Sequence, residues 1–133
     1  MDFEYIKVIK SDLNDIDEAV SFILEKLSGV IRNEELMFNV RIVINEIVIN
    51  SYEHGNKCNK EKGINLKVCV NMDCIHINVK DEGDGINYIF NENRDINMTT
   101  SGRGLRIVKH LVDELEINNN EISAKIKCEG NNI

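Results

Sequence analysis

Two alternating segments in the middle of the chain place the strongest constraint on its fold. Apolar and polar residues alternate over Gly63–Val70 and again over residues 74–79. Only residues 71–73, Asn-Met-Asp, separate the two segments, and such a short polar connection is typical of a β-hairpin. Strands joined by a hairpin pair antiparallel, so we expect an antiparallel sheet rather than a doubly wound parallel one.

Three further segments carry apolar residues at helical spacing. The first begins after several N-capping oxygens at residues 11–15 and is expected to end at Gly29. The second begins after Asn33 and should break at residues 54–56. The third begins near residues 99–104. Its apolar positions are Leu105, Val108, Leu111, Val112 and Leu115.

Strand-like segments at residues 3–9, 116–118 and 121–128 complete the pattern. The resulting order is strand, helix, helix, two strands, helix, two strands. This order predicts an α+β two-layer sandwich, with a mixed, mostly antiparallel sheet and three helices on one face.

Composition limits what the protein can do. Its 133 residues are typical of one domain, so residues 1–133 are expected to form a single domain. The net charge of −7 argues against binding to nucleic acid or to an anionic membrane. No apolar run approaches the ~18 residues that span a membrane, and no signal peptide is expected. The four cysteines form no C-x-x-C pair, which favours reduced thiols in a cytoplasmic protein over a zinc site.

Glu46 and Asn50 stand out on the second helix because their neighbours are apolar. They lie one turn apart beside the predicted core stripe, where Ile42 and Ile49 flank them and His54 continues the row. A surface glutamate with β-branched neighbours explains this pattern as well as a functional pair does. As a functional pair, the amide oxygen of Asn50 would suit Mg²⁺, and the carboxylate of Glu46 would accept a proton from a nucleophile.

The segment Asp81-Glu-Gly83-Asp-Gly85 directly follows the predicted hairpin. Its glycines would let a flat ligand approach the backbone closely. An aspartate at a strand end can accept a hydrogen bond from the exocyclic amine of adenine, whereas guanine presents a carbonyl there. An acidic turn with two glycines is the simpler interpretation of this segment taken alone.

The segment Ser101-Gly102-Arg103-Gly104 opens the third helix. The free N–H groups of a helix N-terminus suit a phosphate, Arg103 adds a cation, and Thr100 and Ser101 add donors. Ordinary N-capping by serine or threonine is the alternative. The chain has neither a P-loop motif nor a Rossmann glycine motif.

These three segments together resemble the motifs of the GHKL ATPases, which have the Bergerat fold. Residues 46–55 (EIVINSYEHG) resemble the N box, residues 81–86 (DEGDGI) the first glycine box, and residues 101–105 (SGRGL) the second. Within this superfamily, the chain is most similar to the anti-sigma factor serine/threonine-protein kinases.

The resemblance implies roles for individual residues. Asn50 would hold Mg²⁺, and Glu46 would be the base for a protein serine hydroxyl that attacks the γ-phosphate of ATP. Asp81 would bind the adenine amine, and Gly83 and Gly85 would shape the base pocket. Further contacts to ATP or ADP are implied for His54, Ile86, Thr100, Ser101, Gly102, Arg103, Gly104 and Leu105.

The resemblance also implies partners. Members of this group bind a sigma factor and phosphorylate a small, STAS-like anti-sigma antagonist on serine, usually as homodimers. Two departures are visible: Thr100 stands where the group often has a basic residue, and residues 119–121 (Asn-Asn-Glu) replace a Gly-Thr pair behind the adenine pocket.

Two alternatives remain open at this point. The chain could be a non-catalytic binding module that nucleotide switches, or the detached ATP-binding domain of a sensor histidine kinase. The second would need a phosphorylatable histidine on a helical hairpin, and His76 and His110 are both expected to be surface residues elsewhere.

Overall fold

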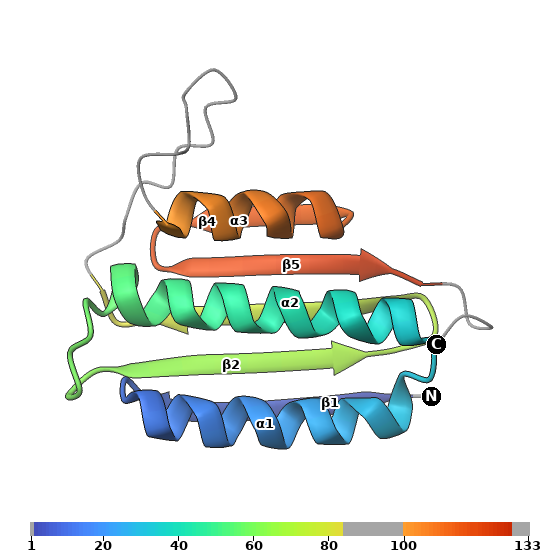
Figure 1. Cartoon of the computed structure of the whole chain (residues 1–133), viewed down its shortest axis with the longest axis horizontal. Helices are drawn as coiled ribbons and strands as arrows, with labels where there is room; N and C mark the ends of the chain where they lie inside the picture. Colours follow the sequence, from blue (N-terminus) through green and yellow to red (C-terminus); the bar gives the residue numbers. More distant parts are fainter. Residues whose placement is uncertain (1, 84–99, 129–133) are drawn as a thin grey trace.

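The computed structural model describes residues 2–83 and 100–128 of the chain (Figure 1). In chain order, the elements are β1 (Phe3–Lys10), α1 (Leu13–Val30), α2 (Glu34–Asn50), the π-helix η1 (Ser51–Gly55), β2 (Gly63–Val70), β3 (Cys74–Asp81), α3 (Thr100–Leu111), β4 (Glu114–Asn118) and β5 (Glu121–Lys127). No helix in these two ranges is long and apolar enough to cross a membrane.

The strands form one sheet in the order β1-β2-β3-β5-β4. The helices α1, α2 and α3 lie side by side on one face of it (Figure 1). The expected α+β two-layer sandwich is therefore confirmed. We expected a mixed sheet, but every pairing among the described strands is antiparallel, because two hairpins reverse the chain and β5 returns beside β3.

The core lies between the sheet and the helices. Alternate residues of β2, β3 and β5 point toward the helices and are buried. The helix α2 supplies the centre of the core, where Val40, Val43, Ile44 and Ile47 have no accessible surface. The remaining strand residues lie on the open face of the sheet. The apolar side of β2, β3 and β5 is therefore the one that the helices cover.

The helices α1 and α2 begin where the capping residues predicted, but α1 does not end where predicted. The side chain of Asp12 accepts a hydrogen bond from the N–H of Asn14, and Asn33 caps α2 by accepting from the N–H of Leu36. The expected end at Gly29 is wrong: α1 continues to Val30, because helical hydrogen bonding persists through the glycine. The next residue closes the helix, since its N–H donates to the carbonyl of Leu27.

Two other boundaries differ from the prediction. The α-helical part of α2 ends at Asn50, and the chain continues as a π-helix instead of an α-helix to residue 53. Leu115 belongs to β4 and not to the third helix. It fits helical spacing, but pairing with Ala124 of β5 places it in the sheet.

Candidate functional site

The helices α2 and α3 meet at Glu46 and Gly104. An ideal Cβ added to Gly104 would lie 2.2 Å from Oε2 of Glu46, which is closer than real side chains approach. Gly104 is buried, and Glu46 is half-buried. The missing side chain at Gly104 therefore lets α3 pack directly against the carboxylate, which brings the second glycine segment to the acid of the first motif.

Asn50 is buried one turn beyond Glu46, with 3% of its surface exposed. Neither Oδ1 nor Nδ2 of its amide has a hydrogen-bond partner among the described residues. A buried polar group without a partner costs about 1–3 kcal/mol, so an amide in this state is suited to receive its partner from a ligand. Its oxygen is a ligand type that Mg²⁺ prefers, and the position fits that ion.

The chain leaves Asn50 through the π-helix η1, a form that often occurs at functional sites. Its last turn closes where the N–H of Asn56 donates to the carbonyl of Ser51 at 2.8 Å. The wider turn delivers Gly55 to the end of β3, where an added Cβ would lie 2.0 Å from Oδ2 of Asp81. Only glycine fits at position 55 with the aspartate in this place.

Asp81 ends β3 with 3% of its surface exposed. Burial raises the pKa of its carboxyl group, while the N–H of Gly83 and the ammonium of Lys62 oppose that shift. The N–H of Gly83 donates to Oδ1 at 2.8 Å, and an added Cβ on Gly83 would lie 2.0 Å from the carbonyl oxygen of Gly55. The carboxylate is thus held between two backbone segments, so it can accept a hydrogen bond from a ligand in a fixed direction.

Asn56 is a residue of this site that the sequence did not reveal. Its side chain is 1% exposed and joins three segments. Nδ2 donates to Oγ of Ser11 at 2.6 Å and to the carbonyl of Gly63 at 2.9 Å, and Oδ1 accepts from the N–H of Glu82 at 2.8 Å. It therefore fixes the end of η1 against the loop that follows Asp81. From the sequence, Asn56 was predicted only to be part of the segment that ends the second helix.

Asn120 holds the other side of Asp81. The N–H of Asp81 donates to the carbonyl of Asn120 at 2.9 Å, and Nδ2 of Asn120 donates back to the carbonyl of Asp81 at 2.5 Å. This residue lies in the segment where the sequence departs from the resembled family. Two hydrogen bonds from Asn120 therefore hold the backbone of Asp81. No local sequence signal indicated them.

Residues 9–127 match the family model described as a histidine kinase-like ATPase domain. The chain belongs to the histidine kinase-like ATPase family. Domains of this family bind ATP or ADP, which agrees with the three segments that meet around Glu46, Asn50 and Asp81.

Individual relatives of this histidine kinase-like ATPase are anti-sigma F factors. An aligned stretch of 93 residues is 30% identical to the anti-sigma F factor of Bacillus thuringiensis (strain Al Hakam) and 31% identical to that of Bacillus cytotoxicus (strain DSM 22905 / CIP 110041 / 391-98 / NVH 391-98). The anti-sigma F factor of Bacillus cereus (strain AH187) is also 30% identical. Each alignment covers 65% of this chain and 63% of the relative, so the chain spans less than two thirds of each relative's length.

The other predicted site residues of this ATPase domain fall into three groups: one lies in the core, one is partly exposed, and the rest lie outside the described part of the structure. Leu105 is 3% exposed and packs in the core. His54 is partly exposed, with Nε2 3.7 Å from a carboxylate oxygen of Glu53, and no hydrogen bond or ion pair of the described residues joins it to Glu46, Asn50 or Asp81. Gly85 and Ile86 lie outside the described residues, as do the side chains of residues 100–103, whose backbone forms the start of α3.

No cluster of metal-binding side chains accompanies Asn50 in the part of the chain that the structure describes. Among residues 2–83 and 100–128, no three histidine, cysteine or acidic side chains are arranged to hold a metal ion. If Asn50 holds Mg²⁺, phosphate oxygens and water can supply the other ligands, as they commonly do for this ion in nucleotide enzymes.

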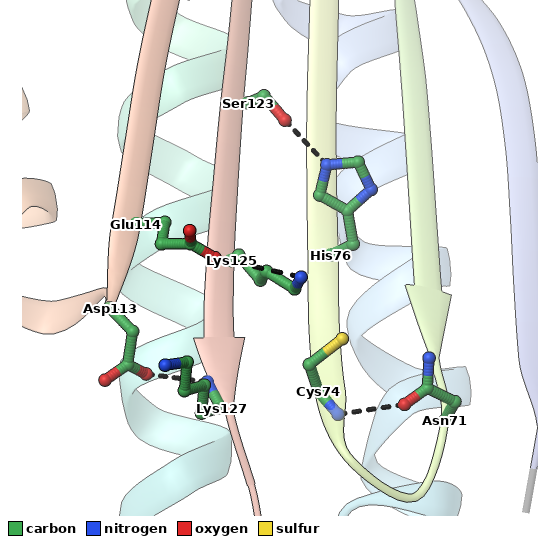
Figure 2. A network of polar contacts seen from close by, with 8 residues as sticks. All are labelled: Asn71, Cys74, His76, Asp113, Glu114, Ser123, Lys125 and Lys127. Atoms are coloured by element: carbon green, nitrogen blue, oxygen red, sulfur yellow. Dashed lines mark hydrogen bonds and ion pairs between the residues drawn. The ribbon is translucent and has the colours of Figure 1, made fainter.

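The open face of the sheet carries a separate polar network (Figure 2). Nε2 of His76 on β3 lies 2.6 Å from Oγ of Ser123 on β5, and Lys125 pairs with Glu114 at 3.7 Å. His76 is therefore a half-buried strand residue with a partner, while His110 is exposed on α3. Neither lies on a helical hairpin, so neither resembles the phosphorylated histidine of a sensor kinase.

Proposed function

We propose that this chain is an ATP-dependent protein serine/threonine kinase that also acts as an anti-sigma factor. The observation that carries the proposal is the position of Glu46. Its carboxylate lies against Gly104 at the start of α3 and one turn from the amide of Asn50, which has no hydrogen-bond partner in the described part of the chain. A proton acceptor thus stands beside a candidate Mg²⁺ ligand and a helix N-terminus suited to phosphate.

The proposed reaction transfers the γ-phosphoryl group of ATP to a protein serine. Glu46 accepts the proton of the serine hydroxyl as its oxygen forms a bond to the γ-phosphorus, and the bond to the β–γ bridging oxygen breaks to leave ADP. Asn50 would help to hold Mg²⁺, which would offset negative charge on the phosphates. Most of the rate enhancement in such transfers comes from positioning and electrostatics.

The contact to adenine is assigned to Asp81, which Asn56 and Asn120 support. The fixed carboxylate accepts a hydrogen bond from the adenine amine, and Gly83 with Gly85 allows the base to approach the backbone. His54, Ile86, Leu105 and residues 100–104 complete the proposed nucleotide contacts.

The relatives are named anti-sigma F factors, which supports a sigma factor as the binding partner. We assign this chain a sigma factor as binding partner, a small anti-sigma antagonist as phosphorylation substrate, and a homodimeric state. The protein would act in the cytoplasm, where ATP and the transcription machinery are found. It would not bind nucleic acid or a membrane itself, in line with its net charge of −7.

Phosphotransfer from labelled ATP to candidate antagonist proteins tests the assignment. Wild type should label its antagonist on serine, and Glu46→Gln should lower the rate by about 10²–10⁴-fold, because it removes the general base. Nucleotide binding should be retained in that variant. Glu25→Gln, an exposed acid in α1, is the matched control and should transfer phosphate normally.

Equal transfer by Glu46→Gln and wild type would show that Glu46 is not the base. If no transfer occurs but nucleotide changes the affinity for the sigma factor in both proteins, the chain is the non-catalytic binding module.

A further inference from the structure

The helix α2 is apolar on its outward side as well as on the side that packs against the sheet. Phe38, Ile42, Asn45 and Ile49 follow one another at intervals of three or four residues, so they share one side of the helix, away from its buried residues. We call these four residues the outer face of α2. Phe38 is 60% exposed, Asn45 is exposed, and Ile42 and Ile49 are half-buried. A helix that is apolar nearly all round is usually covered on every side.

A groove of about 700 Å³ lies at the start of this face, where α1 leads into α2. Met37 and Phe38 contribute to its apolar lining, and Arg32 and Arg41 line the same groove. Both arginines are exposed, and neither forms an ion pair with another residue that the structure describes. Glu34 is the one acid among the described lining residues, so the groove is locally positive in a chain whose net charge is −7.

The outer face continues from this groove to the proposed base. Ile42 precedes Glu46 by four residues and Ile49 follows it by three, so both are its neighbours on the helix surface. Phe38 lies eight residues before Glu46, which is about 12 Å along the helix at about 1.5 Å per residue. Figure 1 shows α2 between α1 and α3, on the side of the sheet that carries all three helices. A molecule that covers the outer face therefore also borders Glu46.

We propose that the outer face of α2 docks the protein whose serine is phosphorylated, and that it selects an acidic segment with an exposed apolar side chain. The apolar side chain enters the groove beside Phe38, and the acids pair with Arg32 and Arg41. The inference rests on the proposed function, since it names the docking surface of the phosphorylation substrate. A membrane or a nucleic acid fits this face less well, because the chain as a whole is acidic and repels such extended polyanions.

The position of the groove sets what the substrate must present. An extended segment advances about 3.3 Å per residue, so about four residues span the distance of about 12 Å between Phe38 and Glu46. The apolar side chain therefore lies about four positions from the phosphorylated serine when the segment is extended, and acids flank it. The groove binds the substrate away from the reacting atoms, so it should act on substrate affinity and leave the chemical step unchanged.

Steady-state phosphotransfer to the STAS-like antagonist proteins of the same organism tests the docking surface. Phe38→Ala and Arg41→Glu should each raise KM for the antagonist about tenfold, because each removes one anchor of the bound segment. The values of kcat and of KM for Mg²⁺–ATP should stay within about twofold of wild type. Raising NaCl from about 50 to about 500 mM should raise KM of wild type more than that of Arg41→Glu, since salt screens the pairing that the variant lacks.

Matched variants elsewhere control for the loss of exposed side chains. Met72→Ala removes an apolar side chain that is also 60% exposed, in the hairpin turn, and Lys67→Glu reverses an exposed charge on β2. Both should leave KM for the antagonist unchanged. Circular dichroism and thermal stabilisation by Mg²⁺–ATP, measured for all four variants, report on the fold and on the nucleotide site, so a change in KM can be separated from unfolding.

Calorimetric titration with the same antagonists separates this proposal from the kinase assignment. If wild type transfers no phosphate but binds an antagonist, and Phe38→Ala weakens that binding about tenfold, the docking surface is supported and the kinase assignment fails. Wild-type KM in both variants, or weakening of the sigma factor complex alone, overturns the docking surface. It is also overturned if none of the antagonists binds wild type, or if Phe38→Ala dissociates a dimer, because the outer face would then join two copies.

Discussion

Gly104 and Gly29 both lie in helices, but only Gly104 has a neighbour that a side chain would meet. A Cβ at Gly104 would lie 2.2 Å from Oε2 of Glu46, whereas a Cβ at Gly29 would have no atom within 4 Å. Glycine within a helix is less favourable than alanine by about 0.5–1 kcal/mol. At Gly104 the lower helix stability of glycine is accompanied by a close contact with Glu46. At Gly29 it is accompanied by no such contact.

Gly104→Ala should separate stability from activity. The methyl group would displace the carboxylate of Glu46, which is the flexible end of its side chain, so the fold should persist while phosphotransfer falls at least about tenfold. Gly29→Ala should raise the free energy of unfolding by about 0.5–1 kcal/mol and leave transfer unchanged. Urea unfolding and initial transfer rates measure both. Normal transfer by Gly104→Ala would show that the position of Glu46 is not critical.

Asp81 should make stability depend on pH in a defined direction. Because burial raises its pKa above the ordinary value of 3.8, the folded protein disfavours the charged carboxylate. The free energy of unfolding should therefore fall as pH rises from that value through the folded pKa, and this loss persists at neutral pH.

Asp81→Asn should consequently melt above wild type at neutral pH without nucleotide, and the difference should vanish below about pH 4. The same variant should lose most of the stabilisation by Mg²⁺–ATP. Scanning calorimetry from acid to neutral pH, with and without nucleotide, measures both effects. Asp73→Asn, in the exposed hairpin turn, is the control and should show neither. A constant difference across pH would contradict the assignment to the Asp81 carboxyl group.

At the scale of elements, the site depends on how η1 ends. The side chain of Asn56 connects η1 with the end of β1, the start of β2 and the loop after β3. Periodicity and capping residues predicted where most helices and strands begin, including the Asn33 cap and the hairpin of β2 and β3. They did not predict the π-helix, because its wider turn is stabilised by contacts of Gly55 and Asn56 with distant segments.

Asn56→Ala should lower the free energy of unfolding by about 2–4 kcal/mol, because it leaves buried partners without hydrogen bonds. It should also weaken ATP binding, since the N–H of Glu82 next to Asp81 loses its acceptor. Asn59→Ala removes one exposed turn bond, to the N–H of Glu61, and should cost less than about 1 kcal/mol. Urea denaturation and ATP titration measure the two variants. An equal loss of unfolding free energy and of ATP affinity in both variants would show that Asn56 does not support the site.

At the scale of the whole molecule, ligand binding should stabilise the fold. Mg²⁺–ATP at about 100 times its dissociation constant adds roughly 2.7 kcal/mol, which corresponds to a rise in melting temperature of about 10 °C for a chain of this size. GTP should give little shift, because guanine presents a carbonyl where Asp81 needs an amine. ATP with EDTA should give a smaller shift than Mg²⁺–ATP if Asn50 shares the ion. Equal shifts with ATP and GTP would contradict the role of Asp81.

The sequence by itself determined most of the helices and strands and the family motifs, because helical and strand periodicity, N-caps and turns depend on residues a few positions apart. Only the tertiary structure decided how the site is held together. The bond from Asn56 to Ser11 joins residues 45 positions apart, and the bond from Asn120 to Asp81 joins residues 39 apart. Gly104 meets Glu46 only because α3 packs on α2. Such contacts arise from the packing of whole elements, which local sequence patterns do not encode.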